Sequence, residues 1–340
     1  MKVGYIWDSA MSLKSYYVKN NTAYAYEDDK PYCFHHGVDP NCFLAGNNYA
    51  WLGDGGSFLN LSEWENKSLP DEDFDIILYS NERIGLDKER YHLYTPDRLR
   101  KHYPNAKIFG NIKESYDYPG VSSERKTNRI KFYKECDAIS MGGVGEKLQS
   151  LEWYANIEKD TGKKFHWISV PLNIDYFYDH FYSNEKNRAI YAYLPNPIHR
   201  RGKTYDFANY IGNKYNLPIK YKPLQPGQKF EYLSQKEFIN LWRDCLFHFN
   251  LDPMFEQPGI QGMQVAAVGS LNIGGHNDTH CVLFPKTATI DEEVLEERIA
   301  KYLEDSNTIV EDLEYAWEKL NEHYSFDAVE KRLKELIEIT

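Results

Sequence analysis

Short apolar runs alternate with longer amphipathic segments along this chain, and the whole alternation occurs twice. The short runs are rich in β-branched and aromatic residues, as strands are. Strands that alternate with helices of this length form parallel β-α-β units, so the sequence predicts an α/β chain with two doubly wound sheets. The expected strands are 1–7, 73–79, 107–112, 136–141 and 166–172, then 188–194, 218–224, 245–251 and 270–275.

Helix starts are marked by residues whose side chains accept backbone N–H groups. Thr95 comes before a proline at the first helical position. Ser234 is followed three residues later by a glutamate, which is a capping box. After residue 290 three acidic amphipathic segments predict helices at 291–305, 306–324 and 325–339. The candidate caps are Thr95, the pair Ser122 and Ser123, Ser234, Ser306 and Ser325.

The chain of 340 residues suits two domains of about 150 residues each. A polar stretch at 171–187 separates the two series of strands, so we expect domains at 1–172 and 173–320, with a helix at 321–340 packing back toward the first domain. Ligands of open α/β sheets bind beyond the carboxyl ends of the strands, which makes a nucleotide-type ligand the first expectation. Residues 20–65 show weak periodicity and predict no clear element.

Composition narrows the setting in which the protein works. With 42% apolar and 27% charged residues, the chain can bury a core. It has no apolar run of about 18 residues and no apolar stretch typical of a signal peptide at its start. Its five cysteines are scattered and odd in number, which favours a reducing cytoplasm over a disulfide framework. We therefore expect a cytoplasmic protein.

Charge is segregated along the chain, whose net charge is −11. Residues 291–340 hold 16 acidic and 6 basic side chains, whereas residues 83–134 hold 13 basic and 6 acidic ones. The two stretches could simply be solvated helical faces of opposite sign. The basic stretch could also bind an anionic partner, because a local excess of Lys and Arg attracts phosphate.

The segment 251–275 carries the clearest motif. A buried strand leads to Glu256 and then to a turn at Gly259 that opens a helix, and Gln264 and Gly269 follow at fixed spacing. This arrangement resembles the donor-site signature of retaining GT-B glycosyltransferases, in which an acidic residue is followed eight positions later by a second one and then by a glycine. Here Gln264 replaces the second acid. The resemblance implies a GT-B fold, which is two Rossmann-like domains facing a central cleft.

Two further segments resemble the same family. Residues 191–207 run from a strand through a basic loop into a helix, where the family places cations that stabilise the departing diphosphate. Residues 170–178 resemble its interdomain segment. The resemblance covers most of residues 166–340 and implies a nucleotide-sugar donor, UDP- or GDP-linked, on the second domain and the acceptor on the first. It implies a hexosyl- or pentosyltransferase that needs no metal.

The resemblance assigns roles to individual residues. Glu256 would bind or polarise the donor sugar, and Gln264 would contact the ribose through its carbonyl. Backbone N–H groups at the helix start would face the diphosphate. The catalytic candidates are Glu256, Arg201, Lys203 and Asp8, the last as a general base if the reaction inverts configuration. The donor-binding candidates are Arg200, Gln257, Gly259, Ile260, Gln261, Gln264 and His276, with His280 nearby.

The acceptor stays open between two classes. The size of the chain and its basic stretch resemble viral enzymes that glycosylate hydroxymethylated pyrimidines in DNA, which would place the protein in a host cytoplasm. The candidate phosphate grips are Arg98, Arg100, Lys101, Arg125, Lys126 and Arg129. The other class is a polysaccharide or glycolipid. Two functions besides transfer also stay open, a non-catalytic nucleotide-sugar-binding module and an epimerase of the same fold.

Four potential metal ligands lie close together in the first quarter of the sequence. Cys33, His35, His36 and Cys42 could hold a structural zinc ion, although their spacing matches no common zinc finger. Tyrosine is abundant, with 28 residues, and tyrosines near residues 16–32 could stack on a sugar or base.

Overall fold

A computed structural model provides the structure of the chain, and its residues form two compact units. The first unit contains the described residues up to Leu172 and also Ser325–Thr340, and the second contains Asn173–Tyr324. The structure describes residues 1–8, 52–53, 57–60, 69, 71–81, 95–112, 123–145, 152–183, 185–192, 202–221, 239–240, 242–251, 261–275 and 277–340.

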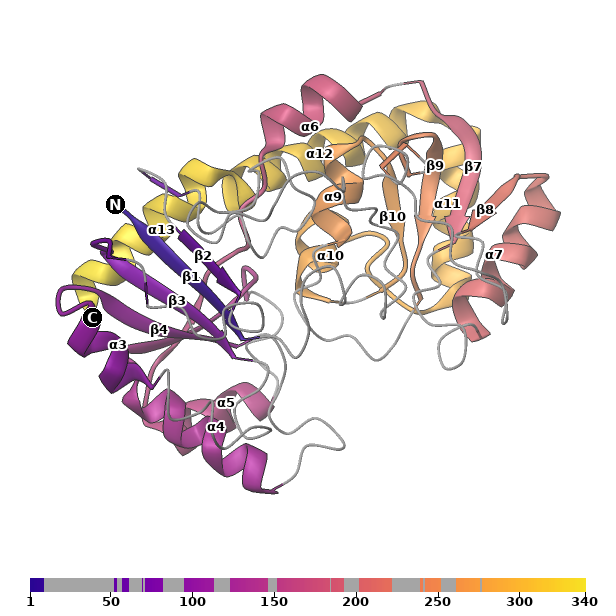
Figure 1. Cartoon of the computed structure of the whole chain (residues 1–340). Coiled ribbons are helices and arrows are strands. Elements are labelled where there is room, and N and C mark those ends of the chain that lie inside the picture. Colours follow the sequence, from indigo (N-terminus) through magenta and orange to yellow (C-terminus); the bar gives the residue numbers. More distant parts are fainter. Residues whose placement is uncertain are drawn as a thin grey trace, which may run out of the picture. The chain divides into compact units, whose positions relative to one another are not determined.

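The first unit is built on a parallel sheet in which the described strands follow the order β2-β1-β3-β4-β5-β6 (Figure 1). Parallel neighbours align residue by residue, as Ile77 of β3 does with Ile108 of β4. Because both faces of a parallel sheet are covered, its strands are apolar nearly throughout. The strands are β1 (Val3–Asp8), β2 (Ser57–Asn60), β3 (Ile76–Asn81), β4 (Lys107–Ile112), β5 (Ala138–Met141) and β6 (Phe165–Trp167).

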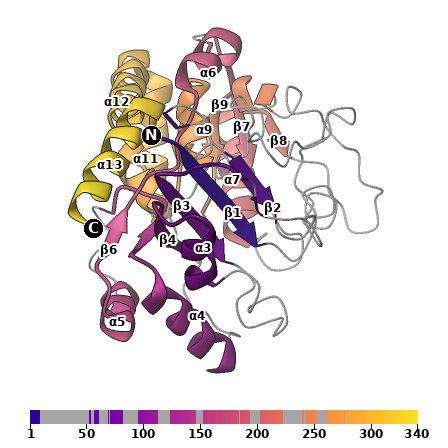
Figure 2. The same ribbon diagram turned by 60° about the vertical axis from the view of Figure 1, so that its left-hand side comes forward.

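Helices between the strands bury one face of this sheet. Phe132 of α4 (Ser123–Glu135) and Ile157 of α5 (Glu152–Thr161) lie in one apolar core with strand residues, and α3 (Pro96–His102) contributes Leu99. A Cβ placed on Gly110 would lie 2.7 Å from the Tyr133 ring, so this glycine lets α4 approach β4 closely. Figure 2 shows α5 beside β6.

The last helix, α13 (Phe326–Ile339), belongs to the first unit. Glu330 accepts a hydrogen bond from the Gly53 N–H at 2.9 Å, and Arg332 donates one to the Ser169 hydroxyl at 3.3 Å. Leu172 and Ser325 also form an isolated parallel bridge. Residues at the end of the chain are thus held by residues far away in the sequence.

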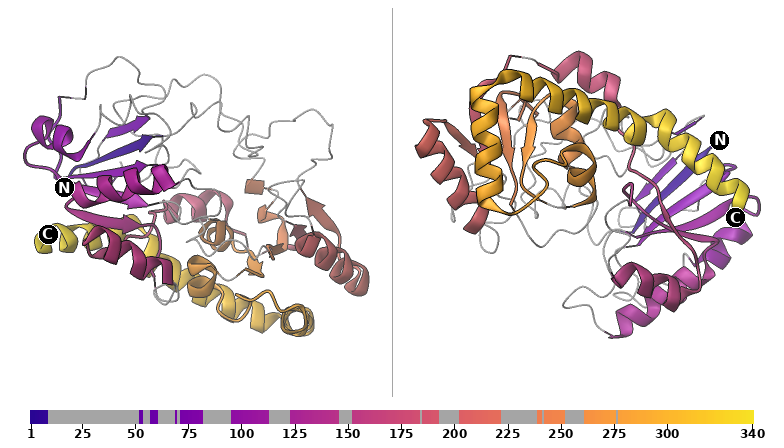
Figure 3. Two further views of the ribbon diagram at one scale, coloured as in Figure 1. Left: turned by 90° about the horizontal axis from the view of Figure 1, so that it is seen from below. Right: turned by 180° about the vertical axis from the view of Figure 1, so that it is seen from behind.

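The second unit has its own parallel sheet, whose described strands follow the order β10-β9-β7-β8. The strands are β7 (Asn187–Ala192), β8 (Ile219–Tyr221), β9 (Cys245–Phe249) and β10 (Leu271–Ile273). Figure 3 shows α10 and α11 on opposite sides of these strands. The helices are α6 (Ile174–Phe181), α7 (Gly202–Tyr215), α9 (Gln261–Ala267), α10 (Asp278–Leu283), α11 (Glu292–Glu304) and α12 (Ser306–Tyr324).

The acidic helices of the second unit are joined by an ion cluster around the buried Asp312. Asp312 of α12 accepts hydrogen bonds from Lys286 at 2.5 Å, from Arg298 at 2.6 Å and from the Tyr302 hydroxyl at 2.5 Å. The pKa of Asp312 is lowered because hydrogen bonds from these three groups outweigh its burial, which is the largest single influence and acts in the opposite direction. Asp312 therefore ties α11 and the segment after α10 to α12.

Most predicted elements are confirmed. Thr95 caps α3 with Pro96 at the helix start, and Ser325 caps α13. The cap before α12 is Asp305 rather than Ser306, because Asp305 accepts the Asn307 N–H at 2.9 Å while Ser306 is itself helical. Strand β2 lies in the stretch that predicted no element. The capping box at residue 234 lies outside the described residues.

Nothing among the described helices is both long enough and apolar enough to cross a membrane.

Candidate functional site

The carboxyl ends of the strands in the second unit define the candidate site. Because β7, β9 and β10 are parallel neighbours, their ends meet at one edge of the sheet. That edge is where ligands of open α/β sheets bind. The chain continues there into residues 193–201 after β7, into 252–260 after β9, and into a glycine turn after β10.

A buried hydrogen bond joins the first two of these exits. The hydroxyl of Thr204, in the first turn of α7, accepts the N–H of Leu251 at 2.9 Å. Leu251 follows β9 and directly precedes the segment that contains Glu256, while Lys203 is the neighbour of Thr204. The structure therefore brings the start of α7 together with Leu251, the last described residue of the β9 exit.

Lys203 is exposed in this first turn of α7, which holds no acidic side chain. The free N–H groups and the dipole of a helix start favour an anion, and an ammonium group adds a full positive charge. The start of α7 can therefore hold phosphate oxygens.

The glycine turn after β10 is Gly274–Gly275. Both residues have positive φ values, 91° and 76°. A Cβ on Gly274 would lie 2.8 Å from the Asn250 carbonyl oxygen, and one on Gly275 would lie 2.4 Å from Nδ1 of His280. A side chain at either position would collide with these atoms, so only glycine lets the turn pack against β9 and α10.

The start of α9 packs against the start of α10 at the same edge. A Cβ on Gly262 would lie 2.6 Å from the His280 ring. Asn277 caps α10 by accepting the His280 N–H at 3.0 Å. His280 is buried between Gly262 and Gly275, so it packs inside the unit and does not face a sugar from the surface.

His248 lies on β9 beneath this edge. Its ring stacks on Tyr191 with a centroid distance of 4.9 Å and meets Trp242 edge-on at 5.2 Å. Burial lowers the pKa of His248 to about 3, with the nearby His280 acting in the same direction. His248 is therefore a neutral residue of the core.

The predicted donor residues are only partly described. Lys203 is exposed at the candidate site, and Gln264 is 2% exposed within the buried helix α9. Gln261 begins α9, but its side chain is not described. The ribose contact of Gln264 stays a prediction. Outside the described residues lie Glu256, Arg200, Arg201, Gln257, Gly259, Ile260 and His276.

In the first unit, Asp8 is the last residue of β1 and aligns with Asn81 at the end of β3. Its backbone is therefore at the carboxyl edge of the sheet. Its side chain is not described, and its role as a base stays a prediction.

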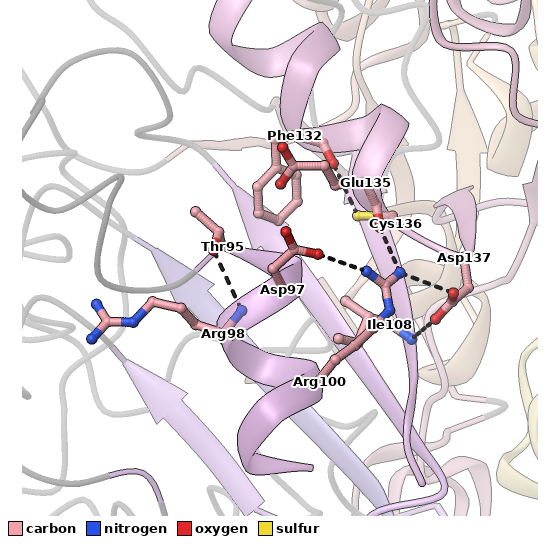
Figure 4. A network of polar contacts seen from close by, with 9 residues as sticks. All are labelled: Thr95, Asp97, Arg98, Arg100, Ile108, Phe132, Glu135, Cys136 and Asp137. Carbon is pink, nitrogen blue, oxygen red and sulfur yellow. Dashed lines mark hydrogen bonds and ion pairs between the residues drawn. The ribbon is translucent and has the colours of Figure 1, made fainter. Parts of the chain in front are cut away.

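Arg100 serves the fold of the first unit rather than a ligand (Figure 4). Its guanidinium donates to the Glu135 carbonyl at 2.5 Å and to the Asp137 carboxylate at 2.9 Å. Asp137 in turn accepts the Ile108 N–H at 2.7 Å. Asp137 directly precedes β5 and Ile108 is the second residue of β4, so this network lies at the amino edge of the sheet, opposite the edge at which ligands bind.

The other predicted phosphate grips differ in exposure. Arg98 is exposed and points away from the Arg100 network (Figure 4). Lys101 is exposed too, but it shares the last turn of α3 with Arg100. Arg129 is 2% exposed, so its side chain is not presented to a phosphate at the surface and it leaves the set of candidates. Lys126 is half-buried, and the side chain of Arg125 is not described.

No group of three or more His, Cys, Asp or Glu side chains within the described ranges could hold a metal ion. The predicted zinc ligands Cys33, His35, His36 and Cys42 lie outside those ranges, as do the tyrosines near residues 16–32.

Sequence reasoning missed several polar residues that shape the candidate site. Thr204, Asn272 and Thr287 are buried and hydrogen-bonded at the carboxyl edge. Asn272 and His248 were visible in principle, because a polar residue inside an otherwise apolar parallel strand is unusual. Thr287 follows α10 in a turn and carries no comparable signal.

Comparison with known proteins identifies the fold. No protein-family model and no curated protein sequence matches the chain. Among solved structures, trehalose-6-phosphate synthase OtsA superimposes with a TM-score of 0.59, covering 100% of this chain and 99% of that one at 8% identity. Anabaena HepE in complex with UDP gives 0.58, covering 100% of both chains at 8% identity.

A third structure is an alpha-glucosyltransferase in complex with UDP-glucose and DNA containing an abasic site. It gives a TM-score of 0.52 at 12% identity and covers 84% of this chain and 86% of that one. The structural neighbours are GT-B glycosyltransferases. The chain therefore has the GT-B fold, and the predicted fold class is confirmed.

Proposed function

We propose that the protein is a glycosyltransferase that moves a sugar from a UDP- or GDP-linked donor to a hydroxyl acceptor. The observation that carries the proposal is the Thr204–Leu251 hydrogen bond, which joins the first turn of α7, beside the exposed Lys203, to the residue that ends the described part of the β9 exit. The GT-B fold supports the proposal, because the neighbouring structures of that fold hold UDP or UDP-glucose.

The reaction breaks the bond between the anomeric carbon and a diphosphate oxygen, and it forms a bond between that carbon and the acceptor oxygen. The proton of the acceptor hydroxyl passes to a base or to the departing diphosphate. Lys203, with Arg201 and Arg200, neutralises the charge that grows on the diphosphate. Glu256 binds the sugar hydroxyls. The base is Asp8 if the configuration inverts.

For the acceptor, we propose hydroxymethylated pyrimidine in DNA, contacted by the first unit. The neighbouring alpha-glucosyltransferase was solved with UDP-glucose and DNA, which supports this choice. The exposed cation at the ligand-binding end of α3 is Arg98, and Lys126 occupies the corresponding first turn of α4. Helix α3 follows β3 and helix α4 follows β4 along the chain, so we propose these two side chains as the phosphate contacts.

A polysaccharide or glycolipid acceptor is the second candidate. It is favoured by the loss of Arg100 and Arg129 from the phosphate-binding set, which leaves few described cations at the carboxyl edge. The salt dependence of binding distinguishes the two acceptors. Log affinity for DNA falls as log salt concentration rises, and each phosphate contact makes this fall steeper by about 0.9. With DNA as the partner, the Arg98→Ala Lys126→Ala double variant should show a salt dependence that is less steep by about 2. A slope near zero for the parent protein would exclude DNA.

Radiolabelled UDP-glucose and GDP-mannose test the proposed reaction itself. A transferase releases the nucleotide through transfer or slow hydrolysis, a binding module releases none, and an epimerase changes the sugar without an acceptor. Lys203→Ala should lower the rate by about a hundredfold or more. Its free energy of unfolding should stay within about 0.5 kcal/mol of the parent, because Lys203 is exposed.

The matched control is Lys301→Ala, an exposed lysine on α11 away from the carboxyl edge, which should leave the rate unchanged. Equal losses of rate in both variants, or a large loss of stability in Lys203→Ala, would count against the assigned role of Lys203.

A further inference from the structure

The glycine turn after β10 is held by hydrogen bonds on both sides of Gly274. The Gly274 N–H donates to the Thr287 carbonyl at 3.0 Å. The Gly274 carbonyl accepts from Nδ2 of Asn272 at 3.0 Å. These two bonds hold the backbone of Gly274 in its positive-φ conformation, which glycine adopts readily.

A third hydrogen bond closes the ring. The Thr287 hydroxyl donates to the Asn272 carbonyl at 2.5 Å, so Asn272, Gly274 and Thr287 are bonded in a closed circuit. We name these three residues the β10 latch. The side chain of Asn272 is fully buried and that of Thr287 is 1% exposed. Neither can contact a ligand directly, so any effect on a ligand must pass through the turn.

The turn is also packed on two sides. The close approaches of Gly274 to the Asn250 carbonyl and of Gly275 to His280 leave no room for it to shift inward. Asn250 itself donates its N–H to the Ile273 carbonyl at 2.9 Å, which joins the exits of β9 and β10. Among the described residues, the hydrogen bonds of the β10 latch are therefore what connects this turn to the segment after α10.

We propose that Thr287 and Asn272 are positioning residues for the nucleotide-sugar, and that they act by holding Gly274–Gly275 rigid at the carboxyl edge. The inference rests on the proposed function, which places the donor at this edge. A preorganised site spends no binding energy on ordering its own backbone, so loosening the turn weakens donor binding. The acceptor, on the first unit, is unaffected.

The test compares Thr287→Val with Thr287→Ser. Valine keeps the shape but removes the hydroxyl that fastens Asn272, whereas serine keeps the hydroxyl. We expect Thr287→Val to raise the KM for UDP-glucose or GDP-mannose about tenfold. Thr287→Ser should keep the KM of the parent protein. The KM for the acceptor should stay unchanged. Binding of the same nucleotide-sugars by calorimetry gives the readout without an acceptor.

Ser270→Ala is the matched control for stability. The Ser270 hydroxyl is fully buried at the amino end of the same strand and bonds the Trp242 and Cys245 carbonyls. Its loss should lower the melting temperature about as much as Thr287→Val while leaving donor affinity unchanged. If both variants lose stability and neither loses donor affinity, the latch is merely structural and the inference fails.

Failure of the inference is distinct from failure of the proposed function. If the parent protein binds neither UDP-glucose nor GDP-mannose, both proposals fail. If it binds one of them and Thr287→Val binds equally well, only the latch proposal fails. Should Thr287→Val not fold, Asn272→Ala removes the other side-chain bond to the turn and carries the same expectation.

Discussion

His248 should make the second unit sensitive to acid. The folded protein holds this histidine neutral, because burial and then the nearby His280 lower its pKa to about 3. In the unfolded chain its pKa is near the ordinary value of about 6.5. Between these two values the unfolded chain binds a proton that the folded protein does not. Stability therefore falls as the pH falls from 6.5 toward 3.

The size of the effect follows from the two pKa values. Each pH unit between them costs about 1.4 kcal/mol, so the contribution at pH 5 is about 2 kcal/mol of unfolding free energy. Above pH 7 the contribution vanishes. Other groups titrate in the same range, so the difference between the parent and a variant at residue 248 isolates this histidine.

The perturbation is His248→Phe, which keeps a ring against Tyr191 and Trp242 but cannot be protonated. Its unfolding free energy should be lower than that of the parent at pH 8 because the new ring fits less well. Between pH 7 and pH 5 the difference should shift in favour of the variant by about 2 kcal/mol. Urea unfolding followed by tryptophan fluorescence measures it, with Trp242 as the adjacent reporter.

A second variant, His248→Gln, guards against an effect of packing. Glutamine disturbs the stacking differently but also lacks the titrating ring, so the pH dependence of its unfolding free energy should differ from that of the parent by the same amount. A difference between parent and His248→Phe that stays flat from pH 7 to pH 5 would refute the reasoning.

Two further predictions concern buried charge. Lys186 donates to the Arg243 and Val268 carbonyls, and burial, with Arg243 next, lowers its pKa to about 7. Between pH 7 and pH 10.5 the unfolded chain therefore binds a proton at this lysine that the folded protein does not. The free energy of unfolding should rise with pH in this range, by at most about 1.4 kcal/mol per pH unit. Thermal unfolding of Lys186→Met should not show this rise. Asp312→Asn should cost about 2 kcal/mol in urea unfolding, because the half-buried Arg298 and the Tyr302 hydroxyl lose a charged hydrogen-bond partner. A loss below about 0.5 kcal/mol would mean that the cluster does not hold α11 to α12.

Local sequence signals decided much of the fold. Thr95 and Ser325 are the correct caps because a cap needs only its own side chain and the next three residues. The apolar runs at 107–112 and 245–251 became β4 and β9, since a strand buried on both faces is recognisable from its residues alone. The short strand β2 was missed because four residues carry no periodicity.

The candidate site depended more on tertiary contacts. The motif at 251–275 and the basic loop near residue 200 pointed to one edge of the second sheet, and the Thr204–Leu251 bond links their ends. The same reasoning could not tell which arginines of the basic stretch face solvent. Arg98, Arg100 and Arg129 have the same charge in the sequence, but of the three only Arg98 is exposed.

The chain's own residue order thus determined two parallel α/β sheets, the helix caps and the edge at which a ligand should bind, because these follow from patterns within a few residues. Tertiary structure alone decided that Arg100 neutralises Asp137, that His248 stays neutral and that Thr287 fastens a turn thirteen residues before it. Each of these outcomes is set by burial and by a partner from another segment. Neither burial nor a distant partner is encoded in the neighbouring residues.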